Sequence, residues 1–79
     1  MQEFKEILLQ NGYKKADQRF IKEQPETKEN DSISHVAVIA KDSIVLAGFR
    51  DNGDLDAYNT GWIYPTPGEL LILLRLFSV

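Results

Sequence analysis

Two apolar runs on either side of a short polar break constrain the fold of this chain more than any other feature. The runs are ISHVAVIA (33–40) and IVLAGFR (44–50), and the break between them is KDS (41–43). Runs rich in β-branched residues and joined by so few polar residues are typical of a β-hairpin. Residues 36–40 are apolar without interruption, which is typical of a central strand covered on both faces. We therefore expect an antiparallel sheet built around this hairpin.

The N-terminal segment QEFKEILLQNG (2–12) has the pattern of an amphipathic helix. Phe4, Ile7 and Leu8 recur at the spacing of one helical face. Gly12 follows at a point where a helix end favours a residue that tolerates a positive φ. The sequence therefore predicts a helix that ends at this glycine.

The next two segments are less regular. Residues 13–22, YKKADQRFIK, fit an exposed edge strand because lysines suit such an edge, but they also fit a second short helix. Residues 24–32 contain no aliphatic side chain, and Pro25 interrupts any regular element. We expect residues 24–32 to form a mobile loop and leave the structure of residues 13–22 open.

The segment TPGELLILLRLF (66–77) is the clearest helix. Thr66 is a favoured N-cap, Pro67 suits the first helical position, and Glu69 stands three residues after the cap. We expect one apolar stripe of this helix to face the core; it consists of Leu70, Leu73, Leu74 and Phe77.

The opposite side of the same helix is also apolar. A helix that is apolar nearly all round must be covered nearly all round, either by the N-terminal helix or by a second copy of the chain. The small core of a 79-residue chain gives a thin margin of stability, which favours self-association. We therefore predict a homodimer interface on this side of the helix, formed by Leu71, Ile72, Arg75 and Leu76.

The stretch DNGDLDAYN (51–59) gathers three acids around an Asn-Gly pair. A calcium loop of the EF-hand type needs oxygen ligands at alternate positions, then a glycine and a late glutamate. Frames that start at Asp51 or Asp54 both lack this pattern. The stretch is therefore better explained as a turn, because Asn-Gly between two apolar runs is a strong hairpin signal.

Two loop lengths are compatible with that turn. A three-residue loop places Arg50 opposite Asp54 and Phe49 opposite Leu55, which pairs charge with charge and apolar with apolar. A two-residue turn at Asn52-Gly53 instead places Arg50 opposite Leu55 and Phe49 opposite Asp56, which pairs unlike side chains. We adopt the three-residue loop, which assigns Leu55 and Phe49 to the core face of the sheet.

In that register the even-numbered positions after residue 53 line the opposite face. They place carboxylates beside large aromatic rings, at Asp54, Asp56, Tyr58, Trp62 and Tyr64. Tyrosine and tryptophan are frequent anchors at interfaces, and carboxylates steer a basic partner toward the site. We expect these residues to bind another protein that has a basic surface.

Catalytic chemistry has little support in this sequence. His35 is the only histidine, and Ser34 beside it points to the other face of a strand, so the two cannot form a nucleophilic pair. Asp54 and Asp56 have no predicted pocket around them. The absence of cysteine removes disulfides and most structural zinc sites. We predict a protein that is not an enzyme and has no metal or cofactor.

Net charge and hydropathy limit the remaining classes. The formal net charge of −3 argues against a nucleic-acid binder, although the basic and aromatic residues of segment 13–22 could contact a single strand. The apolar tail of eleven residues, 69–79, contains an arginine and is too short to span a bilayer. We expect no membrane insertion, no targeting segment and a cytoplasmic location.

Together these patterns predict one α+β domain over residues 1–79. It has an N-terminal helix, an antiparallel meander of three to four strands, and a C-terminal helix packed on the sheet. The expected function is that of a small non-enzymatic protein-binding module, such as an inhibitor or accessory factor of the kind plausible in phages and mobile elements. The alternative is a nucleic-acid-associated regulator that uses the basic segment 13–22.

Overall fold

The structure of this chain is a computed structural model that describes residues 2–29, 31–50 and 56–77. It has the predicted α+β architecture, with five strands where three to four were expected. The elements are α1 (Gln2–Gln10), β1 (Lys14–Ala16), β2 (Arg19–Gln24), β3 (Ile33–Ile39), β4 (Ile44–Arg50), β5 (Asp56–Asn59) and α2 (Pro67–Phe77).

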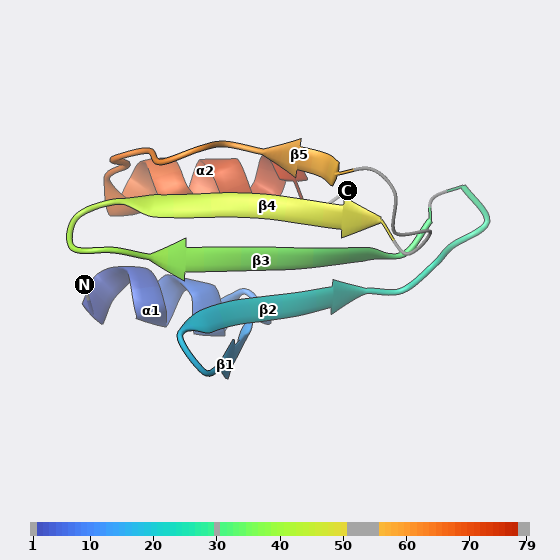
Figure 1. The fold of residues 1–79 in the computed structure, drawn as a ribbon, viewed down its shortest axis with the longest axis horizontal. Helices are drawn as coiled ribbons and strands as arrows, with labels where there is room; N and C mark the ends of the chain where they lie inside the picture. The colour runs from blue at the N-terminus through green and yellow to red at the C-terminus, as the bar shows by residue number, and fades with distance from the viewer. Residues whose placement is uncertain (1, 30, 51–55, 78–79) are drawn as a thin grey trace.

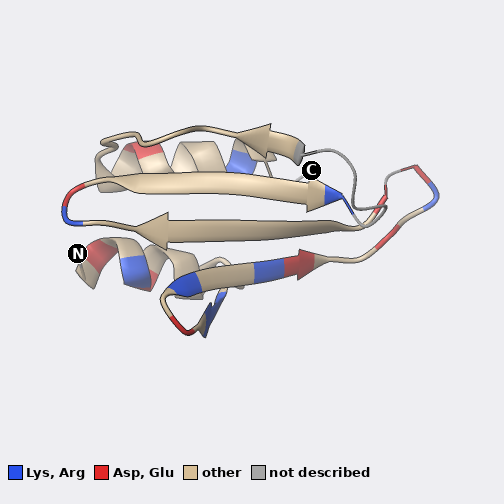
Figure 2. Cartoon of the chain, viewed as in Figure 1, with Lys and Arg blue, Asp and Glu red and all other residues tan. Residues whose placement is uncertain are grey.

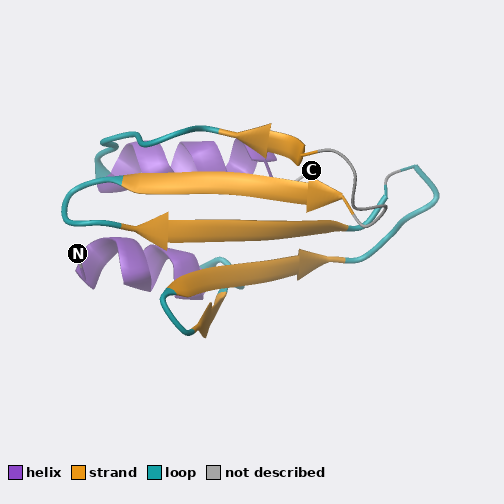
Figure 3. Cartoon of the chain, in the orientation of Figure 1, coloured by secondary structure: helices purple, strands orange, loops and turns teal. Residues whose placement is uncertain are grey.

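The five strands form one antiparallel meander in which each strand pairs with the next along the chain. Both helices lie on the same face of this sheet (Figure 1), and α1 contacts α2. Figure 3 shows the other face with no helix over it. The fold therefore has two layers, and the core lies between the sheet and the helix pair.

Segment 13–22 forms a tight hairpin that contributes β1 and the start of β2. Ala16 pairs with Arg19, so Asp17 and Gln18 make the turn. Asp17 has a φ of 63°, and aspartate tolerates this left-handed conformation better than most residues. The edge-strand alternative is thus the one that the structure contains, and the helical alternative is wrong.

The end of α1 and the start of α2 both have the capping residues that the sequence predicts. Gly12 has a φ of 91°, and the Tyr13 N–H donates to the Leu8 carbonyl at 3.0 Å, which closes the end of α1. At the start of α2, the Thr66 N–H donates to Glu69 Oε1 at 3.0 Å and the Glu69 N–H donates to Thr66 Oγ1 at 3.2 Å. These reciprocal bonds form a capping box and hold the pKa of Glu69 below its usual value.

The core joins one stripe of each helix to one side of the sheet. Full burial of a leucine or phenylalanine side chain contributes about 1.5–3 kcal/mol to the free energy of unfolding. The buried hydrophobic residues of this cluster are Phe4, Leu8, Tyr13, Phe20, Ala37, Ile44, Leu46, Leu70 and Leu74. The stripe predicted for α2 is confirmed, because Leu73 and Phe77 pack against the same cluster.

The register between β4 and β5 differs from the prediction. Phe49 lies opposite Asp56 rather than Leu55, and Gly48 lies opposite Tyr58, with an irregularity in β4 between Gly48 and Phe49. The pairs Ala47–Asn59 and Gly48–Tyr58 still match odd positions with odd and even with even, as predicted. The predicted core face is nevertheless wrong, because the even positions of β4 face the helices: Leu46 is buried under them, whereas Phe49 lies on the side away from them.

The connection between β2 and β3 contains no helix or strand in residues 25–29 and 31–32. It lies within the range predicted for a mobile loop, although β2 includes Gln24. The mobility of this loop stays a prediction.

Among the helices of the described segments, none is long and apolar enough to cross a membrane.

Candidate functional site

The side of the sheet away from the helices is apolar across its two central strands. In an antiparallel sheet with one covered face, outward positions are usually polar. Here the outward positions of β3 and β4, together with one position of β2, form a surface that we call the open face: Ile21, Val36, Val38, Val45, Ala47 and Phe49. Ser34 is the polar outward residue of β3. This side of the sheet is therefore apolar: Phe49 is exposed on it, Ala47 is buried at 6% exposure, and the other four residues are partly exposed.

The strand register aligns the open face in three rows across β2, β3 and β4. The first row is Arg19–Val38–Val45, the second is Ile21–Val36–Ala47, and the third is Glu23–Ser34–Phe49. The valines are half-buried by their neighbours, while Phe49 remains 43% exposed. The aromatic ring is thus the most accessible member of the patch.

Charge on this side of the sheet is concentrated on β2. Figure 2 shows charges of both signs along β2, whereas β3 and β4 carry none until Arg50 at the end of β4. Glu23 Oε2 accepts a hydrogen bond from Ser34 Oγ at 2.7 Å. Arg19 is exposed and makes no ion pair within the described residues. An acid and a base therefore stand at opposite ends of one strand beside an apolar surface.

The residues predicted to bind a partner do not lie in one row. Trp62 is 56% exposed and stands next to Ile63, which bridges Ile44 and packs against the core. Tyr64 is also exposed, and it lines a groove with Ile72 on the helix side of the fold. The two rings are therefore both accessible, and Tyr64 does not lie on the open face.

Tyr58 lies inside the fold, on the side opposite to the one predicted. Its ring stacks on Phe77 of α2 with ring centroids 4.0 Å apart and an interplanar angle of 7°. The ring also covers Gly48, which has no side chain to occupy that space. Tyr58 is therefore partly buried and faces the helices rather than the open face. Asp54 and the side chain of Asp56 lie outside the described residues, so their predicted roles stay predictions.

Tyr58 takes part in a buried polar cluster around His35. Tyr58 Oη lies 2.7 Å from His35 Nδ1, and His35 Nε2 lies 2.8 Å from Gln24 Oε1. Since the Gln24 carbonyl oxygen only accepts, Nε2 carries the imidazole proton and Nδ1 accepts from the Tyr58 hydroxyl. Tyr13 and Tyr58 also share a side-chain hydrogen bond. The cluster satisfies both nitrogens of a neutral imidazole.

The pKa values in the cluster follow from burial. Burial lowers the pKa of His35, and the nearby positive charge of Lys22 lowers it further. Burial raises the pKa of Tyr13 to about 12 and moves the pKa of Tyr58 upward as well. All three groups are therefore neutral near pH 7, and the histidine serves as a satisfied core residue. The sequence carries one indication of this role. His35 and Ala37 are two residues apart on β3 and therefore share a face of the strand, and Ala37 is buried on that face.

The outer side of α2 is exposed, although α1 packs beside this helix. Ile72 is 60% and Leu76 64% exposed, and Leu71 and Arg75 are exposed as well. The predicted homodimer interface is therefore accessible in the single chain, and its role stays a prediction. Beside it runs an open groove of about 490 Å³, lined by Thr60, Ile63, Tyr64, Pro65, Glu69, Ile72 and Leu73.

The aromatic residues of segment 13–22 are not available to stack on bases. Tyr13 and Phe20 are buried in the core, so the segment exposes basic side chains without aromatic rings beside them. Base stacking is a main source of affinity for single-stranded nucleic acid.

No group of three or more histidine, cysteine or acidic side chains that could hold a metal ion occurs among the described residues.

Comparison with known proteins gives no relative for this chain. No protein-family model matches it, and neither the curated proteins nor the solved structures include a significant match.

Proposed function

We propose that this chain is a small non-enzymatic protein-binding module whose binding surface is the open face of the sheet. The observation that carries the proposal is the apolar character of the outward positions of β3 and β4, which end at the exposed ring of Phe49. Small folded proteins rarely keep a contiguous apolar surface in water unless it binds something. A protein partner is the occupant that fits a broad and flat surface of this kind.

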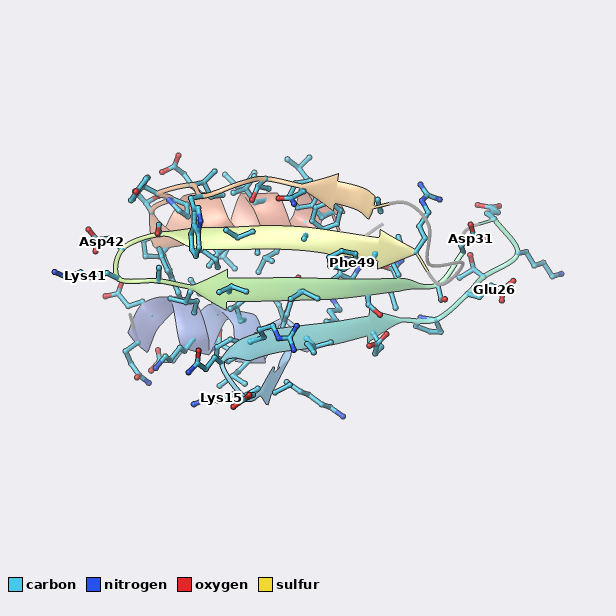
Figure 4. All side chains as sticks on the ribbon, in the orientation of Figure 1. Lys15, Glu26, Asp31, Lys41, Asp42 and Phe49 are labelled. Atoms are coloured by element: carbon cyan, nitrogen blue, oxygen red, sulfur yellow. The ribbon has the colours of Figure 1, made fainter. Side chains whose placement is uncertain are left out.

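Two aromatic residues support the same surface. Phe49 lies near the end of β4, as labelled in Figure 4, and Trp62 follows β5 and lies near the opposite end of β4. Exposed rings at the margins of an apolar patch are typical of the anchors that dominate binding energy.

The outer side of α2 is the second apolar surface, and it supports binding less strongly. It is a single helical stripe, and Arg75 interrupts it. The open face extends over three strands and contains no charge in β3 or β4 before Arg50. A module that binds in this way would act in the cytoplasm as an inhibitor or accessory factor, by occupying a complementary surface on its partner.

Affinity capture with matched variants tests the proposal. The purified chain serves as bait in an extract of the cells that encode it, beside Val36→Lys in the open face and Ile72→Lys on α2. Circular dichroism first establishes that each bait is folded. We expect the wild type and Ile72→Lys to retain the same protein and Val36→Lys to lose it. Equal retention by all three baits would contradict the proposed surface.

A further inference from the structure

We propose that the open face binds a second copy of this chain, with the two sheets face to face about a twofold axis along the row Ile21–Val36–Ala47. This inference rests on the proposed function, because it names the partner of the same surface. It differs from the homodimer predicted from the sequence, which used the outer side of α2. The charges of β2 and the apolar rows of the open face match those of a second copy.

The arrangement of β2 provides the charge complementarity. Arg19 stands two residues before Ile21, and Glu23 stands two residues after it, all on the same side of the strand. A twofold axis across the strands at Ile21 reverses the strand direction and places β2 against β2 of the second copy. Arg19 then meets Glu23 of the second copy, and symmetry repeats the pair.

The same axis also brings apolar residues together. The first and third rows exchange places, so Phe49 of one copy lies over Val45 of the other. The middle row meets itself, which places Val36 against Val36 at the centre of the interface. Lys14 pairs with Ile21 from the edge strand β1, so it continues the middle row and approaches Lys14 of the second copy at the rim, where both exposed side chains can turn into water. The largest exposed ring of the open face is thereby covered.

The alternative face-to-face orientation has no such match. A twofold axis parallel to the strands keeps each row in place and lays β2 over the β5 side of the second copy. The described residue of β5 that pairs with the middle row is Asn59, which carries no charge. Arg19 and Glu23 would then gain no opposite charge within the described residues. Charge pairing therefore selects the axis that crosses the strands.

The surface is small for a stable interface. The strands β3 and β4 have seven residues, β2 has six and β5 has four, so with neighbours about 4.8 Å apart and a rise of about 3.4 Å per residue they span a projected area of at most about 350 Å². A standard stable interface buries about 800 Å² on each partner. The dimer is therefore expected to be weak and to exchange readily with monomer.

Sedimentation equilibrium with a charge exchange tests the inference. The samples are the wild type, Arg19→Glu, Glu23→Arg, and an equimolar mixture of these two variants. Lys28→Glu and Glu26→Arg are the controls, since they make the same charge changes at exposed positions of the β2–β3 connection. In either charge variant alone, both symmetric pairs become repulsive. In the mixture, each Arg19→Glu chain meets a Glu23→Arg chain with opposite charges at both pairs.

We expect the wild type and both controls to dimerise with rising concentration. Each charge variant should dimerise roughly tenfold more weakly, because two exposed pairs are reversed. The mixture should recover the wild-type association, which a folding defect could not produce. A wild type that is monomeric throughout, charge variants that match their controls, or a mixture no better than its components would each overturn the inference.

Sedimentation equilibrium of Val36→Lys and Ile72→Lys determines which of the two apolar surfaces forms the dimer. Loss of the dimer in Val36→Lys alone supports the open face, and its loss in Ile72→Lys alone overturns the inference in favour of α2. A monomeric wild type that still captures another protein through Val36 would overturn the second copy as partner and leave the proposed function standing. Self-association without any captured protein would support the second copy as the partner and contradict the binding of a different protein.

Discussion

The ring of Tyr58 lies over Gly48 of the neighbouring strand and fills the space that a side chain at position 48 would need. On its other side the ring stacks on Phe77. This close approach joins β4, β5 and α2, and it turns Tyr58 toward the helices. The open face consequently lacks the tyrosine that the sequence pattern assigns to it.

Replacement of Gly48 by alanine should destabilise the protein. The added Cβ would collide with the Tyr58 ring, and overpacking of this kind typically costs about 1–3 kcal/mol. The matched control is Gly68→Ala, since a Cβ at Gly68 meets nothing within 4 Å. Urea denaturation should show a lower free energy of unfolding for Gly48→Ala and little change for Gly68→Ala. Equal stability of the two variants would contradict the position of the tyrosine ring.

The free energy of unfolding should decrease as the pH falls below about 6.5. The pKa of His35 is lower in the folded protein than its usual 6.5, because burial and the charge of Lys22 disfavour the imidazolium. Between these two pKa values the unfolded chain binds more protons than the folded chain, so acid favours unfolding. Below the folded pKa the effect reaches its limit. Urea denaturation over a pH series measures this dependence.

The control for the pH series is His35→Gln, which removes the titrating group. We expect this variant to be less stable throughout, because the buried cluster loses its hydrogen bonds, but to show a flatter pH dependence. The range of interest lies above about pH 5.5, where unperturbed carboxyl groups do not titrate. A pH dependence that is as steep in His35→Gln as in the wild type would show that another group is responsible.

Two leucines of α2 should differ sharply in their contribution to stability. Leu74 is 2% exposed and Leu76 is 64% exposed. Leu74→Ala should lower the free energy of unfolding by about 2–5 kcal/mol, and Leu76→Ala should change it by less than about 0.5 kcal/mol. Thermal unfolding at several protein concentrations measures both. If Leu76→Ala destabilised the chain more at high concentration than at low, the homodimer interface predicted on α2 would be supported.

The elements of this fold could be predicted because their signals are local. The capping box of Thr66 and Glu69, the positive φ of Gly12 and the hairpin around residues 41–43 depend on a few neighbouring residues. The hairpin at residues 14–24 remained ambiguous because its lysines fit an exposed helix and an edge strand equally well. Its burial of Phe20, which only the whole fold provides, decides between them.

The faces of the sheet could not be predicted, because β4 is apolar on both sides. Leu46 and Ile44 compete with Val45 and Ala47 for the core, and the alternation that usually separates the two faces is missing. Gly48 lies on the buried side of β4 but has no side chain, so the sequence pattern of that side is less apolar than its burial requires. The ring of Tyr58 fills the space instead. The apolar character that obscured the parity of β4 is the same property that makes the open face a binding surface.

Methyl-resolved NMR on dilution tests the open face most directly. The methyl groups of Val36, Val38 and Val45 report on this surface, and those of Leu71, Ile72 and Leu76 report on the outer side of α2. We predict that the three valines shift with protein concentration while the three residues of α2 do not. Shifts confined to the α2 methyl groups, or no shift at any of the six, would contradict the binding of a second copy to the open face.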